Sequence, residues 1–120
     1  MSQPDKRAKL LIVDDRADVR RGLARFLGLH FDVVTASTAE EAEQLLVEGE
    51  TTYVLCDYWL GRGQPLGTEL IERWRDKYPF VRRIALMTGT KATAIASTEG
   101  ADVIFPKPLN LNKVRDWFMD

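Results

Sequence analysis

The residues best suited to chemistry are five polar side chains, each of which follows a short apolar run of the sequence. In chain order they are Asp14 and Asp15 after the first run, Asp57 after the third, Thr88 after the fourth and Lys107 after the fifth. Three carboxylates brought together repel one another, so their pKa values rise unless a cation compensates. A hard divalent ion such as Mg²⁺ prefers oxygen ligands and keeps positions open for phosphoryl oxygens, which a lysine and a threonine can also bind. This set suits attack by a carboxylate on a phosphoryl group, giving an aspartyl phosphate.

Each of these residues also has an ordinary structural interpretation when it is taken alone. An Asp-Asp pair after a strand is typical of a turn with a helix cap, and Asp57 could cap a loop in the same way. Thr88-Gly89 alone is typical of a turn. The joint occurrence of all five residues, each at the end of an apolar run, favours the functional interpretation.

The apolar runs themselves predict a parallel sheet. Each run is about four residues long, rich in β-branched residues and nearly continuous, which is typical of strands buried on both faces. The five runs are Leu10–Val13, Val33–Thr35, Tyr53–Cys56, Ile84–Met87 and Val103–Phe105. Ligands of such sheets bind outside the carboxyl ends of the strands, where the five polar residues stand.

Helical spacing of apolar residues separates the runs. Four stripes are clear: Val19, Leu23, Phe26 and Leu27; Ala39, Ala42, Leu45 and Leu46; Leu70, Ile71 and Trp74; and Leu111, Val114 and Phe118. Thr38 and Glu41 predict a capping box at the start of the second helix, and Pro79 ends the third. A short helix over Lys91–Ser97 completes the alternation, so we expect an α/β fold with helices on both faces of the sheet.

Length and composition predict one domain without a disulfide framework. The chain has 120 residues, 17 Lys and Arg, 18 Asp and Glu, and a formal net charge of −1. This balance argues against direct nucleic-acid binding, and no apolar stretch is long enough to insert into a membrane. The single cysteine, Cys56, suits a reducing cytoplasm. We expect residues 1–8 to be a polar, flexible lead and residues 9–120 to be the domain, with no room for an output domain.

Over nearly all of Lys9–Phe118 the sequence resembles the receiver domain of two-component response regulators. The matching segments are Leu-Ile-Val-Asp14-Asp15, Val-Leu-Cys-Asp57, Leu-Met-Thr88-Gly89 and Gly100-Ala-Asp-Val-Ile-Phe105-Pro-Lys107-Pro108. The resemblance implies a flavodoxin-like, doubly wound sheet of five parallel strands in the order 2-1-3-4-5.

The resemblance also implies a role for each matching residue. Asp57 would be the phosphoacceptor, and Asp14 and Asp15, together with Asp57 and the backbone carbonyl of Trp59, would hold Mg²⁺. Thr88 and Lys107 would bind the phosphoryl oxygens. Thr88 and Phe105 would form the conformational switch, and the bond between Lys107 and Pro108 would be cis.

Two departures from the family pattern affect the surroundings of the site. The loop after Asp57 is about two residues longer before Gly67 and holds three glycines, so we expect it to be more mobile. From Thr88 to Lys107 there are 19 positions, roughly three fewer than in the family. Because Gly100 keeps its usual spacing from Lys107, the loss predicts a shortened fourth helix and less cover for Phe105.

Other distinctive residues have mainly structural interpretations. His30, the only histidine, lies in a predicted turn away from the strand ends, and Cys56 is expected to be a small buried apolar residue. Trp59 stands beside the acceptor and either gates the site or packs in the loop. Five arginines are interpreted as solvated helix faces: Arg20, Arg21, Arg25, Arg73 and Arg75.

We therefore predict a signalling module rather than a turnover enzyme. It would take a phosphoryl group from a sensor histidine kinase onto Asp57, catalyse this modification and its slow hydrolysis, and pass the signal to an unknown output domain or protein. Two alternatives remain: a degenerate receiver that signals by binding alone, and a Mg²⁺-dependent phosphohydrolase with an aspartate nucleophile. The second is disfavoured because Asp14 and Asp15 are adjacent, whereas those enzymes resemble an Asp-x-Asp pattern.

Overall fold

The computed structural model describes residues 7–89 and 100–120. Its elements are β1 (Lys9–Val13), α1 (Ala17–Leu27), β2 (Asp32–Ala36), α2 (Ala39–Val47), β3 (Thr51–Asp57), α3 (Gly67–Lys77), β4 (Arg83–Thr88), β5 (Val103–Pro106) and α4 (Leu111–Met119). All five predicted strands are confirmed, and each extends beyond its apolar run by one or two residues at one or both ends. The short helix predicted over Lys91–Ser97, and with it the shortened fourth helix, lies outside the described residues.

The five strands form one sheet in the order β2-β1-β3-β4-β5, and all neighbouring pairs are parallel. The predicted α/β class and the strand order that the resemblance implied are both confirmed. Because every strand runs in the same direction, all five carboxyl ends lie along one edge of the sheet.

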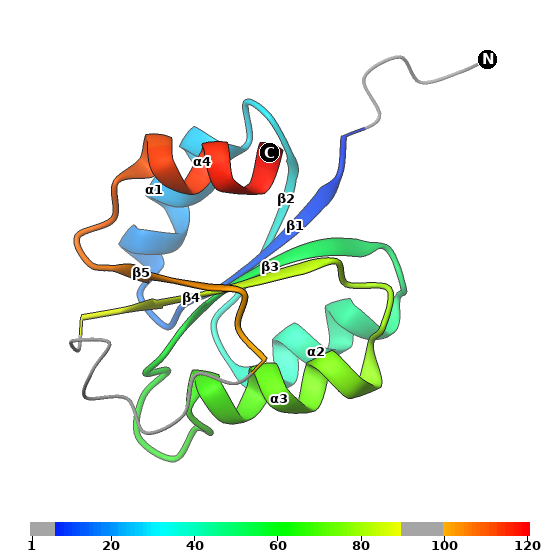
Figure 1. The fold of residues 1–120 in the computed structure, drawn as a ribbon. Coiled ribbons are helices and arrows are strands. Elements are labelled where there is room, and N and C mark those ends of the chain that lie inside the picture. The colour runs from blue at the N-terminus through cyan, green and yellow to red at the C-terminus, as the bar shows by residue number, and fades with distance from the viewer. Residues whose placement is uncertain (1–6, 90–99) are drawn as a thin grey trace.

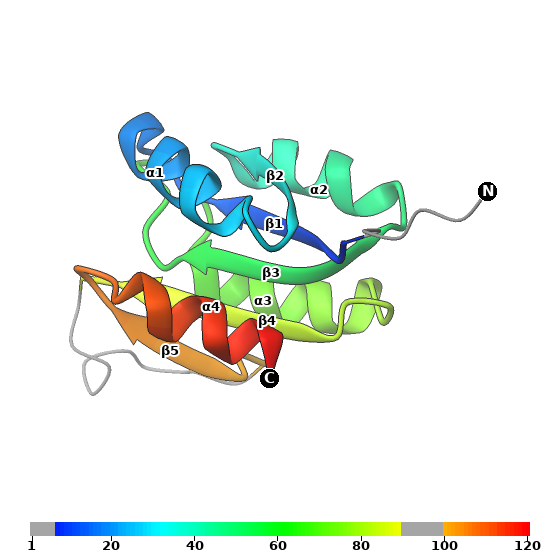
Figure 2. The same cartoon turned by 90° about the horizontal axis from the view of Figure 1, so that it is seen from above.

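Helices cover both faces of the sheet, as predicted (Figures 1 and 2). Helices α2 and α3 pack on one face through a cluster that includes Leu46, Leu70 and Trp74. Helices α1 and α4 pack on the other face through Leu23 and Phe118. In the described residues, no helix has both the length and the apolar composition that a membrane span requires.

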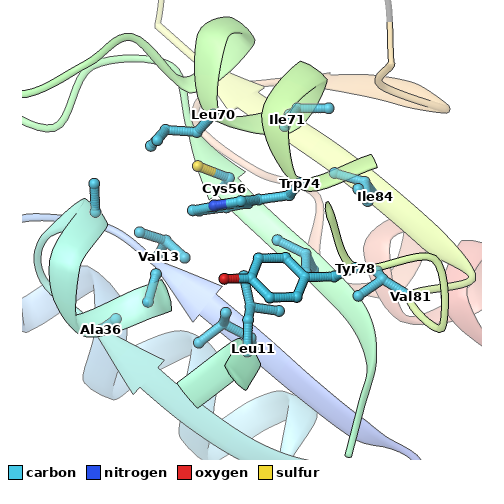
Figure 3. Close-up of a cluster of buried hydrophobic side chains, with 14 of the residues drawn as sticks. Leu11, Val13, Ala36, Cys56, Leu70, Ile71, Trp74, Tyr78, Val81 and Ile84 are labelled. Carbon is cyan, nitrogen blue, oxygen red and sulfur yellow. The ribbon is translucent and has the colours of Figure 1, made fainter. Parts of the chain in front are cut away.

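Trp74 and Cys56 are both fully buried in the cluster under α2 and α3, which confirms their predicted core positions (Figure 3). The indole Nε1 of Trp74 donates to the Glu43 carboxylate at 3.0 Å and so links α3 to α2. The ring of Tyr78 lies in the same cluster, with its hydroxyl pointing inward. This packing holds α2 and α3 against the strands that carry the polar residues.

The predicted capping box at α2 is half confirmed. The Thr38 hydroxyl accepts a hydrogen bond from the backbone N–H of Glu41 at 3.1 Å, as expected for an N-cap residue. The Glu41 carboxylate, however, accepts from the backbone N–H and the hydroxyl of Ser37, one residue before the expected partner. The helix therefore begins where the sequence predicts, with a wider cap.

Candidate functional site

The five predicted polar residues all lie at the carboxyl edge of the sheet. Asp14 directly follows β1, Asp57 and Thr88 are the last residues of β3 and β4, and Lys107 directly follows β5. The Nζ atom of Lys107 lies 3.2 Å from Asp14 Oδ2 and 3.2 Å from Asp57 Oδ2. Segments 93 positions apart in the sequence are thus joined by one ammonium group.

Asp14, Asp15 and Asp57 form a group of carboxylates. One oxygen of each residue lies within 4.8 Å of the corresponding oxygens of the other two. Asp14 and Asp57 are buried, with 0% and 6% of their surface exposed, whereas Asp15 is exposed. Two of the carboxylates are therefore desolvated, and one faces solvent.

The negative charge of the carboxylate group is only partly balanced by the positive charge around it. Burial, and next the neighbouring carboxylate of Asp14, raise the pKa of Asp57 to about 6, against the opposing effects of Lys107 and of the Trp59 backbone N–H that bonds to Asp57. Partial burial acts to lower the pKa of Lys107, but the two carboxylates outweigh it and the pKa is raised. One lysine thus leaves Asp57 short of compensating positive charge.

These residues fit a hard divalent cation. Three carboxylates with ligand oxygens this close together are the donor set that Mg²⁺ and Ca²⁺ prefer. Burial and the Asp14 carboxylate raise the pKa of Asp57 although Lys107 and the Trp59 N–H oppose them, and a bound cation would supply the positive charge that is still missing. The exposed Asp15 leaves one side of the group open to solvent.

Thr88 and Phe105 occupy the positions expected from the sequence. Thr88 is buried, and its backbone carbonyl accepts a hydrogen bond from the Lys107 N–H at 2.8 Å. The peptide bond between Lys107 and Pro108 is cis, as predicted. Phe105 is half-buried, and its ring meets that of Trp117 edge to face at 6.0 Å between centroids. Within the described residues, α4 therefore covers part of Phe105.

Trp59 and His30 are placed differently with respect to the site. Trp59, two residues after Asp57, has an exposed side chain (56%), so it is not packed into the core. His30 lies in the turn between α1 and β2, at the opposite edge of the sheet from the carboxylates. The expectation that His30 stands apart from the site is confirmed.

Arg20 is a site residue that the sequence analysis missed. Its sequence context predicts a solvated helix face, but Arg20 is half-buried and its Nη1 donates to the backbone carbonyl of Asp14 at 2.8 Å. The backbone N–H of Arg16 donates to Asp14 Oδ1 at 2.9 Å. With Lys107 on Oδ2, three protein groups thus hold Asp14. The only signal in the sequence was the position of Arg20, one turn into the helix that follows the acidic pair.

Arg75 also departs from its solvated interpretation. Its guanidinium donates to the Gly100 carbonyl and forms a salt bridge of 2.6 Å with Asp102. The same Asp102 carboxylate accepts from the backbone N–H of Ile84 at 2.8 Å. This network fastens the segment that precedes β5 to α3 and to the start of β4.

Comparison with known proteins identifies the family. Residues 10–118 match the response regulator receiver domain. The chain is 34% identical over 84 residues to the hydrogenase transcriptional regulatory protein HoxA of Cupriavidus necator, an alignment that covers 68% of this chain and 17% of HoxA. It is 32% identical over 114 residues to the response regulator protein PilR of Pseudomonas aeruginosa, which covers 92% of this chain and 25% of PilR. The chain thus spans a quarter or less of the length of these relatives.

Solved structures agree with this assignment. A response regulator from Burkholderia pseudomallei, described with a phosphorylated aspartic acid, a calcium ion and citrate, superposes with a TM-score of 0.79 at 29% identity, covering 89% of this chain and 64% of that one. The fold, the position of the carboxylates at the sheet edge and the family match all indicate the same family. The chain belongs to the response regulator receiver domain family and is a signalling module of two-component systems.

Proposed function

We propose that Asp57 is the phosphoacceptor of this receiver domain. The observation that carries the proposal is the geometry of Lys107, whose ammonium lies 3.2 Å from both Asp57 and Asp14 at the carboxyl edge of the sheet. A carboxylate oxygen of Asp57 would attack the phosphorus of a phosphohistidine; the new P–O bond forms as the P–N bond breaks, and the imidazole leaves. Lys107 is placed to bind a phosphoryl oxygen, and the Thr88 hydroxyl would bind another.

We infer that Mg²⁺ is the physiological cation of the carboxylate group. Asp15, Asp57 and the Trp59 carbonyl would hold it, with Asp14 alongside. When bound, the ion would neutralise charge on the phosphoryl oxygens. The chain's own residues do the rest: Arg20 and Arg16 hold Asp14, and Lys107 holds Asp14 and Asp57 in register.

We propose that Thr88 and Phe105 pass the change at Asp57 to the surface. Movement of the Thr88 hydroxyl toward a phosphoryl group would free space beside β5 and shift Phe105, whose ring contacts Trp117 on α4. Phosphorylation would then bias two conformations that already exist in the unmodified protein.

We propose a sensor histidine kinase as the phosphodonor and an output domain or separate protein as the receiver of the signal. The curated relatives are a transcriptional regulatory protein and a response regulator, each several times longer than this chain, which supports an output function elsewhere. Within this chain we assign the receiver to residues 9–120 and a polar lead to residues 1–8. The free, buried Cys56 suits a cytoplasmic location.

The test is a phosphodonor assay with mass detection. Incubation of the protein with Mg²⁺ and acetyl phosphate should add about 80 Da, the mass of one phosphoryl group. The Asp57→Asn variant, which keeps the shape of the side chain but not the nucleophilic carboxylate, should gain nothing. No gain in the wild type, or an equal gain in Asp57→Asn, would overturn the assignment.

Neither alternative from the sequence analysis is favoured. A receiver that signals without phosphorylation has no need of a lysine bonded to a carboxylate at the sheet edge, and here that contact is intact. A phosphohydrolase would turn over phosphate esters continuously, whereas the chain belongs to a family of signalling modules.

A further inference from the structure

The loop between β3 and α3, residues 58–66, passes directly beside the carboxylate group. Its third residue, Leu60, is buried in the core. At the next residue, a Cβ added to Gly61 would lie 3.6 Å from Asp15 Oδ2. At Gly61 the β3–α3 loop therefore passes close to the exposed carboxylate of Asp15, near enough that a methyl group on Gly61 would be in van der Waals contact with it.

Gln64 ties the loop to the start of helix α2. Its side-chain Oε1 accepts a hydrogen bond of 3.0 Å from the backbone N–H of Ala39, 25 positions earlier in the chain. Ala39 is the first residue of α2, and N–H groups at the start of a helix have no partner inside it. The Thr38 hydroxyl takes the N–H of Glu41, and Gln64 supplies an acceptor for the N–H of Ala39.

The anchored part of the loop is a turn that depends on glycine. The N–H of Gln64 donates to the Gly61 carbonyl at 3.2 Å and closes the turn. Gly61 and Gly63 have φ values of 111° and 84°, a region that side chains other than hydrogen rarely allow. Two glycines give the free loop many conformations, so a hydrogen bond from this turn to a rigid helix selects one of them.

The first part of the loop contacts the acceptor itself. The Trp59 backbone N–H bonds to the Asp57 carboxylate and acts to lower its pKa. The loop thus approaches two of the three carboxylates of the site: its backbone bonds to Asp57 at Trp59, and it passes close to Asp15 at Gly61. A contact that orders this loop therefore also orders the backbone next to the carboxylates that would hold a cation.

We propose that Gln64 is a positioning residue, which through its hydrogen bond to Ala39 holds the β3–α3 loop against Asp15 and so raises the affinity of the site for a divalent cation. The proposal rests on the proposed function in that Asp57 and Asp15 are taken as the cation site. Gln64 itself touches neither the cation nor the phosphoryl group. It acts by pre-organising the loop, so that less ordering remains to be done on binding.

The decisive variants remove the hydrogen bond from either side. Gln64→Met keeps the length of the side chain but lacks the acceptor. Ala39→Pro removes the donor, and proline is well suited to the first position of a helix. The preceding residue, Thr38, has φ −137° and ψ 164°, which is the extended conformation required before proline. Gln44→Met, the same change at an exposed position of α2, is the matched control.

The measurement is the Mg²⁺ dissociation constant of the full chain, from a titration of tryptophan fluorescence, since the exposed Trp59 lies beside the site. Gln64→Met and Ala39→Pro should each weaken Mg²⁺ binding about three- to tenfold, the range expected for one hydrogen bond. The double variant should bind Mg²⁺ with about the affinity of whichever single variant binds it less tightly, because both substitutions remove the same hydrogen bond. Gln44→Met should bind as the wild type does.

A second readout separates positioning from a general structural role. With acetyl phosphate, Gln64→Met should be phosphorylated more slowly at low Mg²⁺ and at the wild-type rate when Mg²⁺ saturates the site. Wild-type affinity in Gln64→Met, an additive double variant, or a rate deficit that persists at saturating Mg²⁺ would overturn the inference. If the wild type binds Mg²⁺ but gains no phosphoryl group, the proposed function fails while the role of Gln64 in cation binding is still decided by the titration.

Discussion

Replacement of Asp57 by asparagine should stabilise the metal-free protein at neutral pH and leave it almost unchanged in mild acid. Asp57 is 6% exposed, and burial together with the Asp14 carboxylate raises its pKa from 3.8 to about 6. Between these two values the folded protein holds a proton that the unfolded chain has released. The free energy of unfolding therefore falls as pH rises through this window and levels off above about pH 6.

The size of the effect follows from the shift. About two pKa units at about 1.36 kcal/mol each correspond to roughly 3 kcal/mol. Asparagine has nearly the same shape and carries no charge at any pH, so it removes this cost. The difference in unfolding free energy between Asp57→Asn and wild type should therefore grow by about 3 kcal/mol from about pH 3 to about pH 7.

Urea denaturation followed by circular dichroism, in the presence of a chelator and at several pH values, measures this difference. Comparison of the two proteins at each pH cancels the titration of groups that do not interact with Asp57. Repetition with Mg²⁺ is the control, because a cation on the carboxylates should stabilise the wild type and narrow the gap. If the difference in unfolding free energy between the two proteins is independent of pH, or shrinks toward neutral pH, the raised pKa of Asp57 is refuted.

Four further predictions test packing, backbone conformation and ligand binding. The Tyr78 hydroxyl is buried without a hydrogen-bond partner among the described residues. Tyr78→Phe should therefore raise the unfolding free energy by about 1 kcal/mol in urea titrations. A lower unfolding free energy would show that the hydroxyl has a partner after all. Gly67→Ala should lower it by about 1 to 3 kcal/mol, because the added Cβ would collide with the Asp57 carbonyl oxygen. Gly22→Ala, with no atom within 4 Å of the added Cβ, should instead raise it by about 0.5 to 1 kcal/mol. Mg²⁺ at about 100 times its dissociation constant should stabilise the wild type by about 2.7 kcal/mol in thermal unfolding, whereas a wild type that Mg²⁺ leaves unchanged would argue against a cation site.

The fold and the members of the site followed from local patterns in the sequence. Continuous apolar runs alternating with helical stripes predict a parallel sheet, and a parallel sheet brings the ends of its strands to one edge. Asp14, Asp57, Thr88 and Lys107 could therefore be placed together although up to 93 positions separate them. Strand direction, which the periodicity predicts, places them on one edge, and the strand order that the resemblance implies makes their strands neighbours.

The tertiary structure decided how the site is held and how its charges balance. Arg20 on Asp14 and Gln64 on Ala39 are contacts of single side chains across the fold, and no periodic pattern marks them. The sequence predicts a solvated Arg20, but in the structure Arg20 donates to the Asp14 carbonyl. The sequence also predicts a longer, more mobile loop after Asp57, and the mobility of that loop stays a prediction. The raised pKa of Asp57 likewise depends on the burial and spacing of groups that only the packed chain brings within a few ångströms. By itself the sequence determined which residues reach the sheet edge, because strand direction follows from local patterns and the resemblance to receiver domains implies the strand order. Only the tertiary structure determined their geometry and electrostatics, because these arise from contacts between distant segments.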